Sequence, residues 1–418
     1  MSEQDVEEQR AGAAVPIEPR VESAHPERGE VPDADGTAPP SSSSLEGDGE
    51  ASLSQWQLIR RGFAQHKLAL FSLNVLVVFY LVAIFAEFIA VAPSSQSRVD
   101  AAYMPPMAVG WSVSEGLHTS LRVQEIDPVT LRKQYLIDDE RVLPLRLLPA
   151  VEPYKLMGLI PMRTRLIGVD RDAADVLGLA EEAGVVDAWY PLGSDRFGRC
   201  IFSRIVIGAR VSLSIGLIGV ACTFVIGMVV GGISGYVGGR TDTAIQRVIE
   251  IINALPQLPL WLALAAVFPP DWSSLTVYFA ITVALSLLNW TGLARVVRGK
   301  ILSLREEDYA VAARLLGASH GRVLFRHLIP GFISHILVAL TLSIPMMILG
   351  ETTLSFLGLG LRPPVVSWGV MLQDCLDVKA VRFYPWLLLP VVFIVVTVMS
   401  FNFVGDGMRD AADPYSSR

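Results

Sequence analysis

Residues 212–236 read SLSIGLIGVACTFVIGMVVGGISGY and contain no charged side chain. About 20 apolar residues in a helix cross the roughly 30 Å hydrocarbon core of a bilayer. Glycines stand four residues apart at Gly227, Gly231, Gly235 and Gly239, and small residues at that spacing line one face of a helix. The stretch predicts a membrane-spanning helix whose glycine face packs closely against another helix.

The composition of the whole chain agrees with a membrane protein. The 418 residues are 52% hydrophobic and 18% charged, whereas soluble proteins average about 25% charged. The net charge of −7 arises in residues 1–50, and the remainder is mildly basic, which suits an anionic membrane surface. No basic stripe with interleaved aromatics is present, so we expect no nucleic-acid partner.

Six apolar segments have the length of a membrane span: residues 68–91, 212–236, 248–268, 275–294, 333–349 and 384–404. Arg60, Arg61 and Lys67 precede the first segment, and seven bases lie between the fourth and fifth. The connection 269–274 has no base. Because positive residues favour the cytoplasmic side, six helices with both termini in the cytoplasm are predicted.

The rest of the chain divides around these segments. Residues 1–55 are acidic and rich in proline and serine, which predicts a disordered cytoplasmic tail. Residues 56–92 are predicted to form a cytoplasmic lead-in and the first transmembrane helix. The long segment 93–205 that follows predicts a mostly β extracytoplasmic domain, with strands at 133–138, 141–148, 154–162 and 165–169. The permease core is then 206–407, followed by a short cytoplasmic tail, 408–418. The predicted fold class is an all-α membrane protein carrying this insertion.

Residues 308–330, DYAVAARLLGASHGRVLFRHLIP, lie in the basic connection 295–327 and just beyond it. Asp308 can cap a helix that ends at Gly317. Ala312 and Ala313 leave a flat surface on which another protein can pack, and the surrounding bases complement an acidic partner. The alternative is an ordinary membrane-proximal loop whose bases only reflect membrane orientation.

Three more stretches accompany this one: YPLGSDRFGRCIFSRIVIGARVSLSIG at 190–216, ETTLSFLGLGLRPPVVSWGVML at 351–372, and FNFVGDGMRDAADPY at 401–415. Together with 308–330, they resemble permeases of ATP-binding-cassette importers, and within these the second permease subunit of dipeptide, oligopeptide and nickel importers. The resemblance covers about 56–92 and 188–415. It implies the type I importer fold, and the insertion is longer than in the typical dipeptide permease.

The resemblance implies that 295–327 is the loop through which separate ATPase subunits drive the permease. The residues carried over are Val311, Ala312, Ala313, Arg314, Gly317, His327 and Pro330. Three positions depart from the family pattern: Val311 replaces glutamate, Tyr190 replaces histidine and Cys200 replaces aspartate. Contact with an ATPase depends on helix shape and small residues, so the change at Val311 is tolerable.

Candidate pathway or outer-gate residues follow the fifth predicted helix: Glu351, Ser355, Phe356 and Trp368. An ionisable group at a membrane edge is a functional candidate, although Glu351 can equally cap a helix or extend to the membrane surface. Glu250 and Asn253 interrupt the third predicted helix and face either a water-filled path or a neighbouring helix.

We expect no metal or disulfide site, because Cys200, Cys222 and Cys375 are widely spaced and His320 and His327 have no suitable neighbours. A phosphate loop is missing, since Gly299-Lys300 is followed by Ile301 and lacks the required preceding glycine. The chain is therefore not expected to be an enzyme or to bind a cofactor, and ATP and Mg²⁺ would bind to partner ATPase subunits.

The predicted function is a peptide-importer permease in the bacterial inner membrane. Expected partners are a second homologous permease in a heterodimer, two ATPase subunits, an extracytoplasmic solute-binding protein and the lipid bilayer. An ion-coupled secondary transporter is the alternative, but no inverted repeat is evident. A membrane-anchored enzyme would need a catalytic motif in 93–205, which has none. Nickel chelates and oligosaccharides remain possible substrates beside peptides.

Overall fold

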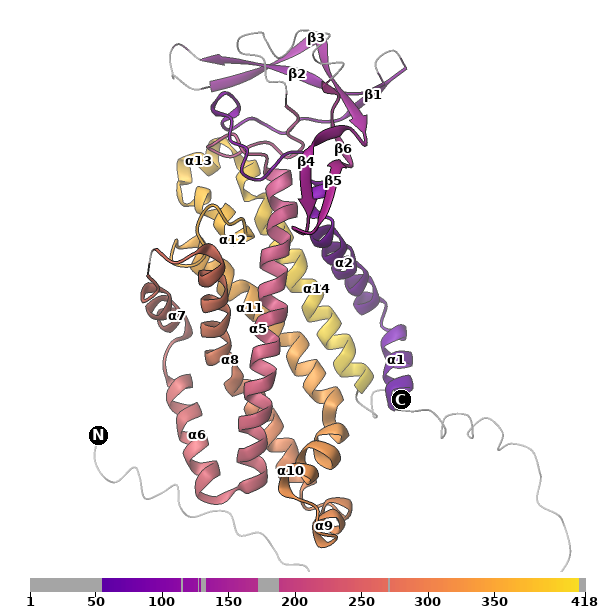
Figure 1. Cartoon of the computed structure of the whole chain (residues 1–418), viewed down its shortest axis with the longest axis vertical. Helices are drawn as coiled ribbons and strands as arrows, with labels where there is room; N and C mark the ends of the chain where they lie inside the picture. The colour runs from indigo at the N-terminus through magenta and orange to yellow at the C-terminus, as the bar shows by residue number, and fades with distance from the viewer. Residues whose placement is uncertain are drawn as a thin grey trace, which may run out of the picture. The chain divides into compact units, whose positions relative to one another are not determined.

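The computed structural model of the chain describes residues 55–113, 116–126, 128, 133–171, 188–269 and 271–412. Nearly all of the predicted acidic tail, 1–55, lies outside these residues, as does 413–418 of the predicted C-terminal tail. Within the described part, long helices carry two small sheets at one end, and a short helix, α9, lies at the other (Figure 1).

Among the described residues, five helices are long and apolar enough to cross a membrane, with spans at Lys67–Ile84, Ile201–Val237, Ser274–Leu304, His320–Phe356 and Pro385–Ala412. A sixth is counted if the bent pair α6 and α7 forms one span. The main helices are α1 (Gln55–Gln65), α2 (Lys67–Ile84), α5 (Ile201–Val237), α6 (Gly239–Ala254), α7 (Gln257–Ala266), α8 (Ser274–Leu304), α11 (Ile333–Phe356) and α14 (Leu389–Ala412).

The shorter helical elements connect these helices or cover their ends. They are α3 (Ala86–Ile89), η1 (Val99–Ala101), α9 (Asp308–Leu315), α10 (His320–Arg322), η2 (Val323–Leu328), η3 (Ile329–Phe332), α12 (Trp368–Met371), η4 (Leu372–Leu376), α13 (Val378–Phe383) and η5 (Pro385–Leu388).

Helix α5 is the centre of the bundle and packs against α2, α6, α8 and α11. Its glycines allow the close approach to α8. A Cβ atom on Gly227 would lie 2.9 Å from the Leu293 side chain, and one on Gly231 would lie 2.5 Å from the Ala294 carbonyl oxygen. A Cβ on Gly235 would lie 2.9 Å from the Arg298 carbonyl oxygen. Backbone-to-backbone contact of this kind needs a residue without a side chain.

Gly239, the fourth glycine of the predicted series, lies outside this contact. Helix α5 ends at Val237, and Gly239 starts α6 with φ +58° and nothing within 4 Å of an added Cβ atom. Its spacing therefore does not place it on the packing face, because the chain turns before reaching it.

Several predicted spans were too short, and at two of them the missed residues include a buried charge. Helix α5 begins at Ile201, inside the predicted insertion 93–205, and α11 continues past 349 to Phe356. Charged residues caused both errors: Arg204 near the start of α5 and Glu351 near the end of α11 are buried with partners. The connection 295–327 is likewise not all loop, since its first ten residues belong to α8.

The predicted third span, 248–268, is not one straight helix. Helices α6 and α7 meet at an angle of 88°, because Pro256 follows α6 and cannot donate the backbone hydrogen bond that would continue it. The first predicted span, 68–91, also breaks: α2 ends at Ile84, and Phe85 separates it from α3.

The insertion contains a four-stranded sheet in the order β1-β2-β3-β6 and a separate β4–β5 hairpin. The strands are β1 (Gly110–Ser112), β2 (Gly116–Ile126), β3 (Lys133–Leu147), β4 (Ala150–Leu156), β5 (Ile160–Thr164) and β6 (Ile167–Val169), and all pairs are antiparallel. Met104, Leu121, Leu143 and Trp189 form part of its buried core, so segments before β1 and after β6 close the domain.

Three strand predictions were wrong. The predicted strands 133–138 and 141–148 are one strand, β3, with a register shift opposite Ser120 and Leu121. The predicted strand 154–162 is instead the β4–β5 hairpin, because the chain turns at Met157 (φ +51°) and Gly158 (φ +74°). Strand β2 was not predicted.

Candidate functional site

Helix α9 is the short helix of the predicted coupling segment. Glu307 occupies its N-cap position and Asp308 is its first residue, so Asp308 does not cap it as predicted. An acidic residue in the first turn still interacts favourably with the helix dipole. The helix ends at Leu315, Leu316 is its C-cap residue, and Gly317 follows with φ +81°, a conformation that glycine adopts without steric cost.

Helix α9 is fixed on one side and free on the other. Ala310 is fully buried in a cluster with Val323 of η2 and Ile301 of α8. The Arg314 guanidinium donates a 2.7 Å hydrogen bond to the Arg305 carbonyl oxygen. These contacts attach α9 to η2 and, through the shared buried cluster, connect it to α8 and α11.

The structure places the seven predicted coupling residues in one segment with differing exposure. Ala312, Arg314, Gly317 and Pro330 are exposed, and Val311, Ala313 and His327 are half-buried.

Two leucines that the sequence reasoning missed are the most exposed apolar residues of this segment. Leu315 is 84% exposed and Leu316 is 89% exposed. They lie at the C-terminal end of α9, immediately before Gly317. Two leucines beside the helix-ending glycine in an otherwise basic segment were the available signal. Exposed apolar side chains on a rigid helix suit contact with a protein partner.

Glu351 lies at the centre of a buried polar cluster near the end of α11. Its Oε1 atom accepts hydrogen bonds of 2.8 Å from the hydroxyls of Ser355 and Ser367. The Ser355 hydroxyl also accepts a bond from the Leu361 amide at 3.0 Å. Glu351 is fully buried, so it neither caps the helix nor extends to the membrane surface. It ties α11 to the turn that leads into α12.

Trp368 joins the same region to α5. Its indole nitrogen donates a 3.0 Å bond to the Ile205 carbonyl oxygen, and its amide donates a 3.1 Å bond to the Ser212 hydroxyl. Phe356 is half-buried at the end of α11 and packs against the same apolar core. The four predicted gate residues therefore lie in one packed region near α12, and three of them are buried.

Glu250 and Asn253 lie apart from that region, on α6. Asn253 accepts a 3.0 Å hydrogen bond from the Thr291 hydroxyl of α8, which is the helix–helix contact considered above. Glu250 is exposed and pairs with Arg247 of its own helix at 2.6 Å.

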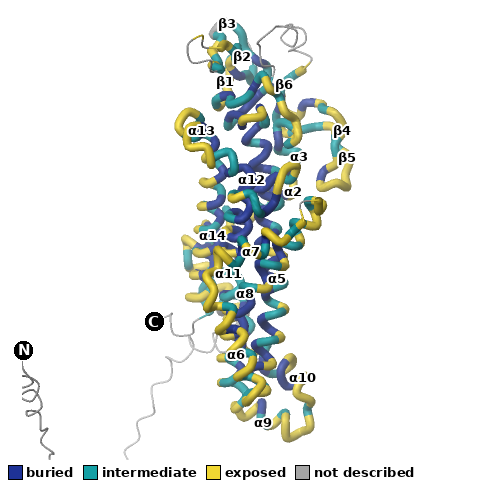
Figure 2. Tube along the Cα trace, turned by 90° about the vertical axis from the view of Figure 1, so that its left-hand side faces the viewer, coloured by how far each residue is buried: buried dark blue, intermediate teal, exposed yellow. Residues whose placement is uncertain are grey.

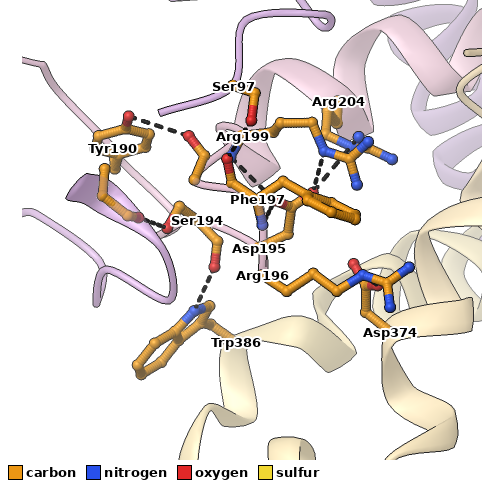
Figure 3. A network of polar contacts seen from close by, with 12 residues as sticks. Ser97, Tyr190, Ser194, Asp195, Arg196, Phe197, Arg199, Arg204, Asp374 and Trp386 are labelled. Atoms are coloured by element: carbon orange, nitrogen blue, oxygen red, sulfur yellow. Dashed lines mark hydrogen bonds and ion pairs between the residues drawn. The ribbon is translucent and has the colours of Figure 1, made fainter. Parts of the chain in front are cut away.

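A second polar cluster, which we call the Asp195 network, precedes α5 (Figure 3). Asp195 is 3% exposed and accepts hydrogen bonds from the Phe197 amide at 2.9 Å and the Arg199 amide at 3.0 Å. Its other oxygen pairs with Arg199 at 2.6 Å and with the buried Arg204 at 3.5 Å. The carboxylate thus closes the turn and neutralises an arginine inside the first turns of α5.

The Asp195 network also reaches the segment that precedes α14. Arg196 pairs with Asp374 of η4 at 2.9 Å, and the Trp386 indole donates a 3.0 Å bond to the Ser194 carbonyl oxygen. Burial, together with the nearby Asp195 charge, raises the pKa of Asp374 despite its arginine neighbours. These contacts connect the insertion and the start of α5 to the segment between α11 and α14.

The sequence of the Asp195 segment does not by itself identify its role. The alternating charges of Asp195, Arg196 and Arg199 were the visible signal. Their partner Asp374 is remote in the sequence, so its pairing could not be inferred from spacing.

Two of the three positions that depart from the family pattern, Tyr190 and Cys200, lie next to the Asp195 network. Tyr190 is buried and donates a 3.2 Å hydrogen bond to the Gly198 carbonyl oxygen. Cys200 is buried at the N-cap position of α5 and makes no side-chain capping bond. Both side chains are accommodated within the core of the insertion.

Comparisons with known proteins agree with this arrangement. Residues 227–417 match the family described as binding-protein-dependent transport system inner membrane component. Residues 54–106 match the N-terminal TM domain of oligopeptide transport permease C.

The chain matches several peptide-transport permeases over most of their length. The oligopeptide transport system permease protein OppC of Bacillus subtilis (strain 168) is 42% identical over 229 residues, 54% of this chain and 72% of the relative. The dipeptide transport system permease protein DppC of the same organism is 39% identical over 54% of this chain and 69% of the relative. OppC of Escherichia coli (strain K12) is 34% identical over 61% and 81%.

The resemblance found in the sequence is confirmed by these matches, and the membrane-spanning helices indicate a multi-pass inner-membrane protein. The chain belongs to the binding-protein-dependent transport system inner membrane components, the translocation permeases of ATP-binding-cassette transporters.

Proposed function

We propose that the chain is the translocation subunit of an importer for di- or oligopeptides, driven by separate ATPase subunits. The observation that carries this proposal is α9, which presents Leu315 and Leu316 to solvent while Ala310 fixes it to the core. The peptide substrate is supported by the relatives, whose names specify oligopeptides and dipeptides.

In this proposal, α9 is the contact with the ATPase subunits. ATP and Mg²⁺ bind to those subunits, and this chain binds no cofactor. Closure of the ATPases moves α9, and the movement passes through η2, against which α9 packs, and through the shared buried cluster to α8 and α11. Ala312, Ala313, Arg314 and Gly317 form the contact surface with the two leucines. His327 and Pro330 lie behind it, where the chain leads into α11.

The proposed topology counts α6 and α7 as one broken span, which gives six spans with both termini in the cytoplasm. Seven basic residues between α7 and α11 stand in the last part of α8 and in the segment around α9 that follows it, including Arg305, Arg314 and Arg322. Positive residues favour the cytoplasmic side. The β sheets at the opposite end then lie outside the cell.

The remaining partners follow from this topology. An extracytoplasmic binding protein delivers the peptide at the end that carries the β sheets. A second, homologous permease completes the pathway as a heterodimer. The Glu351 cluster and Trp368 lie toward that outer end of the bundle, where we place the outer gate, with Ser355 and Phe356 at the end of α11.

Uptake into proteoliposomes tests the proposal. The complete complex is reconstituted with its ATPases and binding protein, and uptake of a labelled oligopeptide is followed with ATP and with a non-hydrolysable analogue. We expect uptake with ATP that persists when an ionophore collapses ion gradients. Uptake that requires an ion gradient and ignores ATP would instead establish the ion-coupled alternative.

A further inference from the structure

The β4–β5 hairpin carries an uncharged apolar tip between two basic residues. Residues 155–163 read KLMGLIPMR. At the tip, Met157 is 50% exposed, Leu159 is 81% exposed and Ile160 is 58% exposed. Lys155 and Arg163 are exposed one on each strand. A run of exposed apolar residues on a folded surface is a defect unless it has a function.

The tip is a defined turn. Leu156 pairs with Ile160 and Lys155 with Pro161 in the hairpin register. The Gly158 amide donates to the Lys155 carbonyl oxygen at 3.2 Å, and the Leu159 amide donates to the Leu156 carbonyl oxygen at 3.0 Å. Leu156 is buried, whereas Met157, Leu159 and Ile160 around it are exposed.

The hairpin is attached at the C-terminal end of the first membrane helix. The Met157 amide donates to a Glu87 carboxylate oxygen of α3 at 3.5 Å. Glu87 in turn binds Arg210 of α5 at 2.5 and 2.7 Å. The Leu166 amide donates to the Phe88 carbonyl oxygen at 2.8 Å. Figure 1 shows β4 and β5 beside the end of α2.

This attachment places the tip next to an exposed apolar surface of the first membrane helix. Helix α2 has the hydropathy of a membrane span, and only 22% of its span residues are buried. Its exposed apolar side chains continue to the end of the helix, with Leu81 at 48%, Ile84 at 41% and Phe85 at 44%. In Figure 2 the hairpin projects to the side of the helices near α2 and α3, with exposed residues at its end.

The charge pattern indicates which surface the tip meets. A lipid leaflet is apolar at the acyl boundary and carries phosphates just outside it. Basic side chains bury their aliphatic stems and keep their charged ends at that level, and interfacial segments insert about 5–10 Å below it. The apolar tip with Lys155 and Arg163 one step behind it has this arrangement.

We propose that residues 157–161 insert into the headgroup and acyl boundary of the leaflet at the C-terminal end of α2, and that Lys155 and Arg163 bind lipid phosphates. The hairpin then anchors the insertion to the bilayer as well as to α3 and α5. The anchor holds the four-stranded sheet at a fixed height above the membrane.

A probe on the tip tests this directly. The full complex carrying Leu159→Cys, with Cys222 and Cys375 replaced by alanine, is labelled with the fluorophore NBD. It is reconstituted into vesicles of phosphatidylethanolamine and phosphatidylglycerol that contain nitroxide-labelled lipids. The matched control carries the probe at Val113, which follows β1 and is 92% exposed.

We expect nitroxide lipids to quench the probe at residue 159 and leave the probe at residue 113 bright. Lys155→Gln combined with Arg163→Gln should reduce the quenching, and the reduction should be smaller in vesicles without phosphatidylglycerol if the two residues bind that anionic lipid. Equal quenching at both sites overturns the proposal. Absence of quenching at residue 159 does so too, and if aqueous iodide also fails to reach that probe, a protein covers the tip instead.

Discussion

At the scale of single residues, Gly198 determines whether the Asp195 network can form. Gly198 has φ +69°, and an added Cβ atom would lie 1.8 Å from the Arg98 carbonyl oxygen. Gly198→Ala should therefore lower the melting temperature. The alanine must adopt an unfavourable φ, which alone costs about 1–3 kcal/mol, and the backbone at Arg98 must also move to make room for the Cβ atom. Thermal unfolding of the purified protein in detergent measures this.

Gly116 provides the matched control for that variant. It also has φ +69°, but nothing lies within 4 Å of an added Cβ atom. Gly116→Ala should lower the melting temperature only by the amount that the unfavourable φ causes. Equal losses in the two variants would show that the close contact at Gly198 does not matter.

Glu351 makes a second prediction at this scale. Its Oε1 atom satisfies the buried hydroxyls of Ser355 and Ser367. Glu351→Gln keeps a carbonyl oxygen that accepts both bonds, whereas Glu351→Leu leaves them unmade, at about 1–3 kcal/mol for each unsatisfied group. The melting temperature should fall much further for the leucine variant. A leucine variant as stable as the glutamine variant would contradict the role of this cluster.

At the scale of elements, the contact between α5 and α8 depends on glycine. A Cβ atom on Gly231 would lie 2.5 Å from the Ala294 carbonyl oxygen, whereas one on Gly232 would lie 3.3 Å from the end of the Leu324 side chain. Gly231→Ala should separate the two helices and reduce the yield of folded protein in gel filtration. Gly232→Ala should be tolerated, because a side chain can move more easily than backbone. The reverse order would contradict the packing.

The attachment of the β4–β5 hairpin should depend on pH. Burial raises the pKa of Glu87, but the Arg210 and backbone hydrogen bonds outweigh it and the net pKa is lowered. The contact therefore contributes its full stabilisation at pH values above the ordinary glutamate pKa of about 4.3. The stabilisation is lost as the pH falls through the lower pKa that Glu87 has in the folded protein. Hydrogen exchange in the hairpin, corrected for intrinsic rates, should rise at acidic pH in the wild type.

Glu87→Gln is the control for this titration. Its hairpin should exchange faster at neutral pH, and acid should add little. A wild-type hairpin that keeps its protection in acid would show that the ion pair with Arg210 does not hold it.

The sequence predicts those elements whose residues need no partners from elsewhere in the chain. A continuous apolar run such as 275–294 within α8 predicts a membrane span from its composition alone. The ends of α5 and α11 were missed because Arg204 and Glu351 are acceptable in a buried helix only when Asp195, Ser355 and Ser367 lie beside them. Those neighbours come from other parts of the chain.

The candidate sites divide in the same way. Helix α9 was predicted near its true position because a first-turn acid, small residues and a terminal glycine are local signals. The exposure of Leu315 and Leu316 was not predictable, since it depends on how η2 and α8 pack around Ala310. The Asp195 network required the pairing of Arg196 with Asp374, which only the folded chain reveals.

At the scale of the whole molecule, the structure places α9 at one end of the helices and the β sheets at the other (Figure 1). A permease driven by ATPases on one side and supplied by a binding protein on the other needs such separated contact surfaces. The Asp195 network and the Glu351 cluster lie between them and join α5, α11 and the segment before α14. In the proposed mechanism, movement at α9 reaches the end that carries the β sheets because these helices move as connected bodies.

The most direct test of this account is the ATPase activity of the reconstituted complex with Leu316→Asp. Leu316 is 89% exposed, so the substitution should leave the permease folded while placing a charge on the proposed ATPase contact. Stimulation of ATP hydrolysis by peptide-loaded binding protein should be lost in Leu316→Asp and retained in Leu316→Met. Undiminished stimulation in the aspartate variant would contradict the assignment of α9 as the coupling element.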